Sequence, residues 1–254
     1  MIVSHRHRFI FLKSKKTAGT SVELALSAVC DPGDIITPLA QPEDEPLRRG
    51  LSPQNWRRRT LAANAQRKLA EVLDHCTKRI DYYEHIKASR ARKYLGERVW
   101  KSYFKFTVER NPWDRQVSYW QFKTRKLGCF GMPFAAFLET EYANLSSADI
   151  YMIDDKLAID HVVRYEHLAS DLKAVLDHLG IETTLDLPRA KGNYRQVGDY
   201  RVQYDDATRE WVAQTYGKEI DLFGYRFEDP EPRHLDGRIR MAAPLAFEDR
   251  LSCS

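Results

Sequence analysis

One stretch, "FLKSKKTAGTS", limits the possible folds more than any other part of the sequence. The residues "RFIFL" that run into it are β-branched and aromatic, which is typical of a buried strand. The residues "TSVELALSAV", which begin at the end of this stretch and continue beyond it, have the periodicity of a helix. Thr20 and Glu23 have the spacing of a capping box, which places Lys16 and Gly19 in the turn before that helix. The stretch therefore predicts a strand, a glycine-containing loop and a helix.

A loop of this kind is suited to holding an anion. Backbone amides, the positive end of the helix dipole and a lysine converge there, and Gly19 lets the backbone approach the ligand closely. The alternative is an ordinary turn with solvated lysines. A nucleoside-triphosphate loop requires G-x-x-x-x-G-K-[ST], whereas the glycine here follows the lysines, so that class of phosphate loop is disfavoured.

A second segment, "YFKFTVERNPWDRQVSYW", repeats the order of strand and helix. Asn111 is the expected N-cap, followed by a proline at the first helical position. Arg110 therefore ends a strand, and Ser118 lies near the start of the helix. In the alternative interpretation, Arg110 only forms an ion pair with Glu109 or Asp114, and Ser118 is a surface hydroxyl.

Together the two segments resemble sulfotransferases that use 3′-phosphoadenosine 5′-phosphosulfate (PAPS). "KKTAGTS" resembles their 5′-phosphosulfate loop, and "RNPWDRQVS" resembles the segment whose arginine and serine hold the 3′-phosphate. "HVVRYEHLASDLKAVLDHLGI" and "YDDATREWVAQTYGKEIDLFGYRF" resemble the family's later strand and helix and its C-terminal helix. The resemblance covers residues 8–228 and is to the soluble bacterial branch related to carbohydrate sulfotransferases, but residues 31–80 fit it least.

This resemblance implies a set of site residues and no metal ion. Lys16 would stabilise the charge that develops on the leaving phosphate, while Lys13 and Lys15 would supply only electrostatic background. In "RAKGNYRQVGDYR" the family's loop closes over the donor, so Lys191 or Arg195 would contact the 3′-phosphate or the acceptor. The full set expected to bind the donor is Lys16, Thr17, Ala18, Gly19, Thr20, Ser21, Arg110, Ser118, Lys191 and Arg195.

One histidine stands out as a candidate general base. His85 lies in the polar segment "DYYEHIKASRARKYLG", upstream of the Arg110 strand, where the related carbohydrate sulfotransferases carry a catalytic histidine. A histidine with a pKa near 6.5 can accept a hydroxyl proton around neutrality. Glu84 is the reserve candidate, because other sulfotransferases use a carboxylate, and His85 as a hydrogen-bonded loop residue is the alternative. We assign Arg164 and Glu166 to a structural ion pair at a strand end.

The expected fold is α/β, a P-loop-like three-layer fold with a mainly parallel central sheet flanked by helices. The 254 residues suffice for a single sulfotransferase domain. "RFIFL", "YFKFTV" and "HVVRY" each precede a helix, so the phosphate sites should gather at the carboxyl edge of the sheet. Residues 31–80 are expected to form an acceptor-side surface loop and a basic amphipathic helix over Trp56–Lys78, and residues 229–254 a C-terminal tail.

Charge and composition limit the partners. The chain has 40 Lys and Arg against 36 Asp and Glu, a net charge of +4, which is too small to indicate nucleic acid. The basic segment is either a solvated helix face or a surface that steers an acidic saccharide or a lipid headgroup, so membrane contact would be peripheral at most. We find no secretory signal or apolar span and expect a cytoplasmic protein. The four cysteines form no metal or redox pattern and are expected to be reduced thiols.

The sequence therefore predicts a PAPS-dependent sulfotransferase acting on a hydroxyl, with a saccharide, glycolipid or other glycoconjugate as the favoured acceptor. Two rival functions remain. A P-loop phosphotransferase would need a Walker lysine and carboxylates for magnesium. A non-catalytic polyanion-binding protein would explain the basic segment but not two complete donor motifs.

Overall fold

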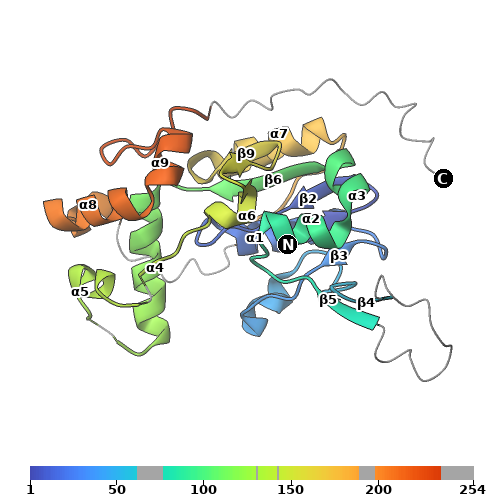
Figure 1. The fold of residues 1–254 in the computed structure, drawn as a ribbon, viewed down its shortest axis with the longest axis horizontal. Coiled ribbons are helices and arrows are strands. Elements are labelled where there is room, and N and C mark those ends of the chain that lie inside the picture. Colours follow the sequence, from blue (N-terminus) through green and yellow to red (C-terminus); the bar gives the residue numbers. More distant parts are fainter. Residues whose placement is uncertain (62–76, 130, 142, 189–197, 236–254) are drawn as a thin grey trace.

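A five-stranded sheet forms the centre of the computed structural model, which describes residues 1–61, 77–129, 131–141, 143–188 and 198–235 (Figure 1). The strands lie in the order β3-β1-β2-β6-β9. β2, β6 and β9 are parallel, and β1 is antiparallel to both of its neighbours. Their bounds are β1 Ile2–Ser4, β2 Phe9–Phe11, β3 Ile35–Ile36, β6 Phe104–Glu109 and β9 His161–Arg164. The expected α/β fold is confirmed, but the sheet is mixed: β2, β6 and β9 are parallel, whereas both pairings of β1 are antiparallel.

The strand register brings three loops to one edge of the sheet. Phe11, at the end of β2, pairs with Phe106, and Glu109, at the end of β6, pairs with Arg164 at the end of β9. The carboxyl ends of these parallel strands therefore point the same way, as predicted. In α/β sheets this edge is where ligands bind.

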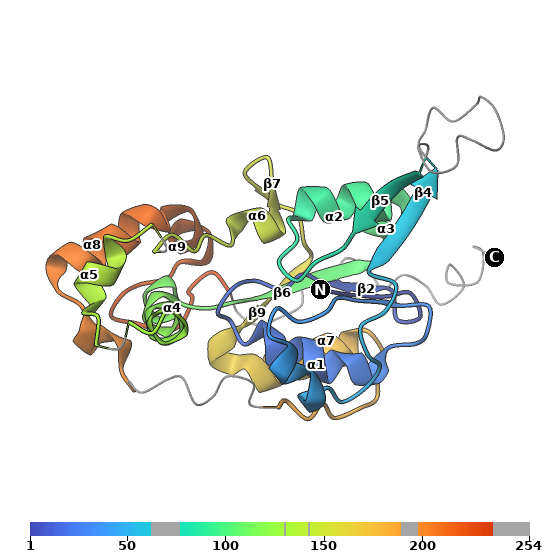
Figure 2. The same ribbon diagram turned by 90° about the horizontal axis from the view of Figure 1, so that it is seen from below.

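Helices cover both faces of the sheet, which gives three layers (Figure 2). On one face lie α1, Gly19–Leu26, and α7, Leu168–His178. On the other lie α2, Ala88–Leu95, and α3, Glu97–Ser102. At one end of the molecule gather α4 Pro112–Lys126, α5 Phe134–Leu138, α8 Asp206–Thr215 and α9 Gly217–Phe223 (Figure 1). The short helix α6 spans Ala148–Tyr151. Two antiparallel strand pairs lie outside the central sheet: β4 Arg57–Leu61 with β5 Thr77–Asp81, and β7 Met152–Ile153 with β8 Lys156–Leu157. The 3₁₀ segments in the described ranges are Ser27–Val29, Pro42–Leu47, Tyr165–His167 and Tyr200–Gln203.

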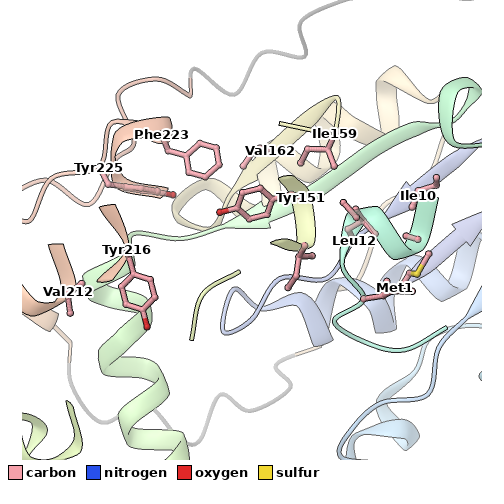
Figure 3. Close-up of a cluster of buried hydrophobic side chains, with 14 of the residues drawn as sticks. Met1, Ile10, Leu12, Tyr151, Ile159, Val162, Val212, Tyr216, Phe223 and Tyr225 are labelled. Carbon is pink, nitrogen blue, oxygen red and sulfur yellow. The ribbon is translucent and has the colours of Figure 1, made fainter. Parts of the chain in front are cut away.

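Alternation along β2 explains how one strand supports two cores. Phe9 and Phe11 belong to the apolar cluster on the α1 and α7 side, whereas Ile10 and Leu12 belong to the cluster on the α2 and α3 side. All four are fully buried. Burial of a side chain of this size contributes about 1.5–3 kcal/mol, so β2 is anchored from both faces. Figure 3 shows the second cluster, which extends through Tyr151 to the α8 and α9 end.

Three expectations about elements need correction. The basic segment Trp56–Lys78 is not one helix, because its two ends are the antiparallel strands β4 and β5, whose backbones pair from Arg57 opposite Asp81 onward. Residues 62–76 lie outside the described part of the chain. The proline- and acid-rich segment before it contributes β3 to the sheet edge. The C-terminal helix is two helices, α8 and α9, which meet at Tyr216.

Of the helices in the described ranges, none combines the length and the apolar character required to span a bilayer. The two described cysteines, Cys30 and Cys129, are free thiols. Burial raises the pKa of the Cys30 thiol to about 12. A thiol with so high a pKa is unreactive, which agrees with the structural role expected for it.

Candidate active site

A cavity of about 440 Å³ opens at the carboxyl edge of the sheet, where the loops after β2, β6 and β9 meet. It brings together the two segments that the sequence assigned to phosphate binding. It is lined by the loop and helix residues Lys13 to Ser21, by Ala40, Gln41, Glu84 and His85, and by Arg110, Ser118, Tyr119, Gln121, Phe122, Leu145 and Tyr165. Lys191 and Arg195 fall outside the described residues.

The loop between β2 and α1 has an unusual backbone. Lys16 and Ala18 adopt left-handed φ angles of 62° and 60°, which non-glycine residues adopt at an energetic cost. Turns that contain left-handed residues form concave arrays of amide groups that bind anions. The strain is therefore consistent with a loop shaped for a ligand.

The predicted capping box at Thr20 is wrong. The first helical residue of α1 is Gly19, and its N-cap is Ala18, which forms no side-chain cap. Glu23 is fully buried and contacts Lys13 and the amino group of Met1 instead. The N-cap side chain therefore makes no hydrogen bond to the first-turn amides of α1, which can meet an anion instead.

Hydroxyl groups tie this loop to the neighbouring strand. The Ser14 hydroxyl donates to the Val108 carbonyl of β6 and lies 2.6 Å from the Thr17 hydroxyl oxygen. Ser14 and Thr17 are both buried. The loop is thus held by β6, the strand that also delivers Arg110.

Gly19 is required for space rather than for its backbone angle. A Cβ atom placed there would lie 2.6 Å from Cγ of Lys13 and 3.4 Å from the Ser14 carbonyl oxygen. The contacted Cγ belongs to the base of a buried side chain, which cannot swing away. The loop therefore packs directly on the stem of Lys13.

We expect Gly19→Ala to lower the free energy of unfolding by about 1–3 kcal/mol, the usual cost of overpacking a close-packed site. Chemical denaturation of the purified variant would measure it. Gly33→Ala is the matched control, because a Cβ there meets nothing within 4 Å. Equal stability of the two variants would show that the Lys13 stem can move aside.

The second phosphate segment has the predicted cap. Pro112 is the first residue of α4, and Oδ1 of the N-cap Asn111 accepts a hydrogen bond from the Trp113 amide at 3.1 Å. Ser118 is half-buried on α4 and lines the same cavity as Arg110. The expected strand-to-helix junction is therefore confirmed.

Arg110 connects this segment to the phosphate loop. Its Nε donates to Asp114 Oδ2 at 2.7 Å, so the alternative ion pair exists, but a second guanidinium nitrogen donates to the Lys16 carbonyl at 3.2 Å. The guanidinium also lies over the Tyr165 ring, 4.0 Å from its centroid. Arg110 is thus a buried cation fixed by three elements at the cavity wall.

His85 is held in one tautomer by the backbone. Its Nδ1 lies 2.9 Å from the Lys13 carbonyl oxygen, which can only accept, so Nδ1 carries the proton in the neutral ring and Nε2 carries the lone pair. The side chain is 33 % exposed and lines the cavity. Burial lowers the pKa of His85 to about 4, against the opposing effect of Glu84, so the ring is neutral at pH 7.

Glu84 is already engaged as an ion-pair partner. Its Oε1 contacts the Lys13 ammonium, and its Oε2 accepts from the Ala40 amide at 3.1 Å. Burial alone would raise the pKa of this carboxyl, but the charges of Lys13 and His85 and the hydrogen bond from Lys13 lower it to about 2. An ionised carboxylate with so low a pKa has little affinity for a proton.

The three lysines of the loop have different environments. Lys16 lines the cavity with its ammonium 4.2 Å from the centroid of the Phe122 ring. Lys15 donates from its amide to the Ser147 hydroxyl and from its ammonium to the Ser146 carbonyl. Lys13 is buried in the contacts to Glu23 and Glu84, so its description as electrostatic background is wrong.

Sequence reasoning missed other residues around the site. Arg115 is fully buried and joins Glu109 of β6, at 2.6 Å, to Glu219 of α9, at 3.4 Å. The predicted pair of Arg164 with Glu166 is also wrong: Arg164 pairs with Asp171 at 2.8 Å, and Glu166 accepts from the Asn111 amide. The presence of an aromatic side chain in the cavity wall could have been predicted from the sequence, since Phe122 lies one turn beyond Ser118 on the same helix.

Comparison with known proteins agrees with the geometry. A family model described as "Sulfotransferase family" matches residues 1–226, which include both phosphate segments. An uncharacterized protein of Archaeoglobus fulgidus is 26% identical over 113 residues, which cover 42% of this chain and 94% of that protein. No solved structure matches the chain significantly. Because the family match spans most of the chain, the protein belongs to the sulfotransferase family and is a sulfotransferase enzyme.

Proposed function

We propose that the protein transfers a sulfuryl group from PAPS to a hydroxyl of a saccharide or glycoconjugate. The observation that carries this proposal is the convergence, on one cavity, of the two segments predicted to bind the donor. A donor with a phosphosulfate at one end and a 3′-phosphate at the other needs two such segments at a fixed separation. The family match over residues 1–226 fits one catalytic domain that contains both.

The donor would lie across the two strand-to-helix junctions. The loop from Lys16 to Ser21 would hold the 5′-phosphosulfate with backbone amides, hydroxyls and the Lys16 ammonium. Arg110 and Ser118 would hold the 3′-phosphate, and Lys191 or Arg195 would add contacts to the donor or the acceptor. The hydrogen bond from Arg110 to the Lys16 carbonyl ties the two junctions to each other.

The transfer needs charge stabilisation on one side and proton removal on the other. As the acceptor oxygen forms its bond to sulfur, the bond between sulfur and the bridging oxygen breaks, and that oxygen keeps the electron pair. The Lys16 ammonium would stabilise this negative charge. Nε2 of His85 would take the proton of the acceptor hydroxyl, because the lone pair lies on that nitrogen.

His85 is a better candidate base than Glu84 on two grounds. Its Nε2 lone pair is presented by a partly exposed side chain, whereas both Glu84 oxygens already accept from Lys13 and Ala40. A pKa of about 2 also makes Glu84 the weaker base. A base with the pKa of His85, about 4, works by accepting the proton as the oxygen bonds to sulfur, since the hydroxyl becomes far more acidic in that transition state.

Calorimetric titration with three nucleotides, without magnesium, tests the donor assignment. We expect wild-type protein to bind 3′-phosphoadenosine 5′-phosphate (PAP) more tightly than AMP or ATP. Arg110→Ala should weaken PAP about ten- to hundredfold, because one charge-assisted hydrogen bond contributes roughly 1.5–3 kcal/mol. The affinity for AMP, which lacks the 3′-phosphate, should change much less.

The comparison between PAP and AMP separates loss of the phosphate contact from general damage by loss of the ion pair with Asp114. Arg92→Ala is a control. Arg92 lies on α2, forms an exposed ion pair with Glu97 of α3, and does not line the cavity. Equal or tighter binding of ATP would favour a phosphotransferase instead. Steeply salt-dependent binding that ignores the 3′-phosphate would favour a polyanion-binding protein.

A further inference from the structure

A buried ion cluster lies in the wall of the cavity, which Lys13 and Glu84 help to line. The Lys13 side chain is only 2% exposed, and its ammonium contacts Glu84 and, at 3.2 Å, Glu23. A lysine is almost never removed so completely from water unless it is paired. This lysine lies two residues beyond the end of β2, at the start of the phosphosulfate loop.

Lys13 touches both halves of the proposed reaction centre. On the donor side it contacts Glu23 of α1, and its stem supports the loop at Gly19. On the acceptor side its ammonium holds Glu84, and its carbonyl accepts the proton on His85 Nδ1. Among the described contacts, those of Lys13 connect the segment of His85 directly to the phosphate loop.

We propose that Lys13 is a positioning residue: by holding Glu84 ionised and in place, it keeps the Nε2 lone pair of His85 available to accept a proton, at a fixed place relative to the phosphosulfate loop. This inference rests on the proposed function, in which His85 is the base. Lys13 does not itself touch the reacting atoms. It acts through Glu84, the residue directly before His85 in the chain.

The charge of Lys13 matters because Glu84 lies close to the working nitrogen. Glu84 Oε2 is 3.9 Å from His85 Nε2. Without Lys13, Glu23 and Glu84 would face each other as buried carboxylates, and among the described contacts Glu23 would keep the Met1 amino group and the neutral Thr37 hydroxyl. Glu84 would then take up a proton or turn away, and a protonated Glu84 can donate to Nε2 and occupy the lone pair. The charged groups that act on His85 are Glu84, Lys13 and the Met1 amino group.

Two variants separate this role from simple stabilisation. Lys13→Met keeps an unbranched side chain only one atom shorter and removes the charge. Lys13→Met/Glu84→Gln also removes the opposing charge, so it leaves fewer unpaired groups and is the variant expected to fold if the single one does not. Lys173→Met, which breaks an exposed pair with Asp177 on α7, is the matched control.

The decisive measurement is heteronuclear NMR of the imidazole nitrogens, assigned with His85→Gln. In the wild type we expect the His85 proton on Nδ1 and an Nε2 that accepts no hydrogen bond from Glu84, and in both Lys13 variants an Nε2 signal shifted by a hydrogen bond donated from position 84. Turnover of PAPS with a panel of p-nitrophenyl glycosides should fall about ten- to hundredfold in kcat, the scale expected for a misplaced catalytic group. PAP affinity should stay within about twofold. Lys13→Arg should recover part of kcat.

An unchanged Nε2 signal and kcat in a folded Lys13 variant would overturn the proposal, as would failure of both variants to fold, which would make the cluster purely structural. The outcome is distinguishable from failure of the proposed function. If His85→Gln kept full kcat, His85 would not be the base, yet the NMR result would still report whether Lys13 keeps the Nε2 lone pair of His85 available.

Discussion

Lys16→Ala should lower kcat by about 10²- to 10³-fold, the loss that follows removal of one group that stabilises developing negative charge. PAP should still bind, because the backbone of the loop and Arg110 remain. Radiolabelled PAPS and the glycoside panel would measure kcat, and calorimetry would measure the affinity for PAP. The expected result is a large fall in kcat with a small change in affinity.

The backbone at this position makes alanine a clean replacement. Lys16 has a left-handed φ of 62°, and lysine and alanine both carry a Cβ atom, so the two side chains bear a similar conformational cost there. The variant therefore removes the ammonium and its contact with Phe122 without relieving strain. Glycine would confuse the result, because it would relax the loop.

Lys126→Ala is the matched control, since Lys126 is exposed in the last turn of α4 and does not line the cavity. It should leave kcat unchanged. If Lys16→Ala instead weakened PAP strongly and left kcat intact, Lys16 would serve only in binding. The charge on the leaving oxygen would then need another stabilising group from the cavity wall.

Local signals explain why the architecture could be predicted from the sequence. "RFIFL" and "YFKFTV" are apolar runs followed by loop and helix signals, and the register of three parallel strands then places their loops at one edge. Asn111 followed by proline is a local signal as well, and its cap formed as predicted. Chemistry determined within a few residues is visible in a sequence.

Errors arose where a residue's partner is distant in the chain. The Thr20 and Glu23 spacing satisfies a capping box, yet Glu23 pairs with Lys13 and the Met1 amino group, which are buried beside it only in the folded protein. The basic segment has helical spacing, but Arg57 at its start finds a strand partner in Asp81. A tertiary ion pair and a sheet ladder both override a local preference.

A distant partner also explains why the buried ion pair of Lys13 could not be predicted. Three lysines within four positions look alike in the sequence, and nothing local separates the one that turns inward. Its partner Glu84 lies far along the chain, and Glu84 was itself considered as a base. The pairing changes both interpretations, because an ion-paired carboxylate of low pKa is a poor proton acceptor.

His85→Gln should lower kcat by about 10²- to 10⁴-fold, the usual contribution of a general base. Glutamine is close to histidine in size and can still donate to the Lys13 carbonyl, so donor affinity should be nearly unchanged. His167→Gln is the control, because His167 pairs with Glu231 at the surface and lies outside the cavity lining.

The pH dependence of kcat supplies the sharper test. The neutral form of His85 is the active one, so kcat should fall as pH drops through the pKa of His85. Burial lowers that pKa from 6.5 to about 4, and activity should therefore persist well below pH 6.5. The donor must be saturating, because a phosphate group changes charge near pH 6 and would add its own effect on binding. His85→Gln should lose the acid limb of the profile.

Glu84→Gln distinguishes the two candidate bases. If Glu84 were the base, this variant would lose activity to the same extent, and the wild-type acid limb would follow a pKa of about 2 instead of about 4. If His85 is the base, Glu84→Gln should keep an acid limb, but at a lower pH, because the Glu84 charge raises the pKa of His85. Loss of activity in Glu84→Gln would thus identify Glu84 as the base. An acid limb shifted to lower pH would identify His85 as the base and show that the Glu84 charge raises the pKa of His85.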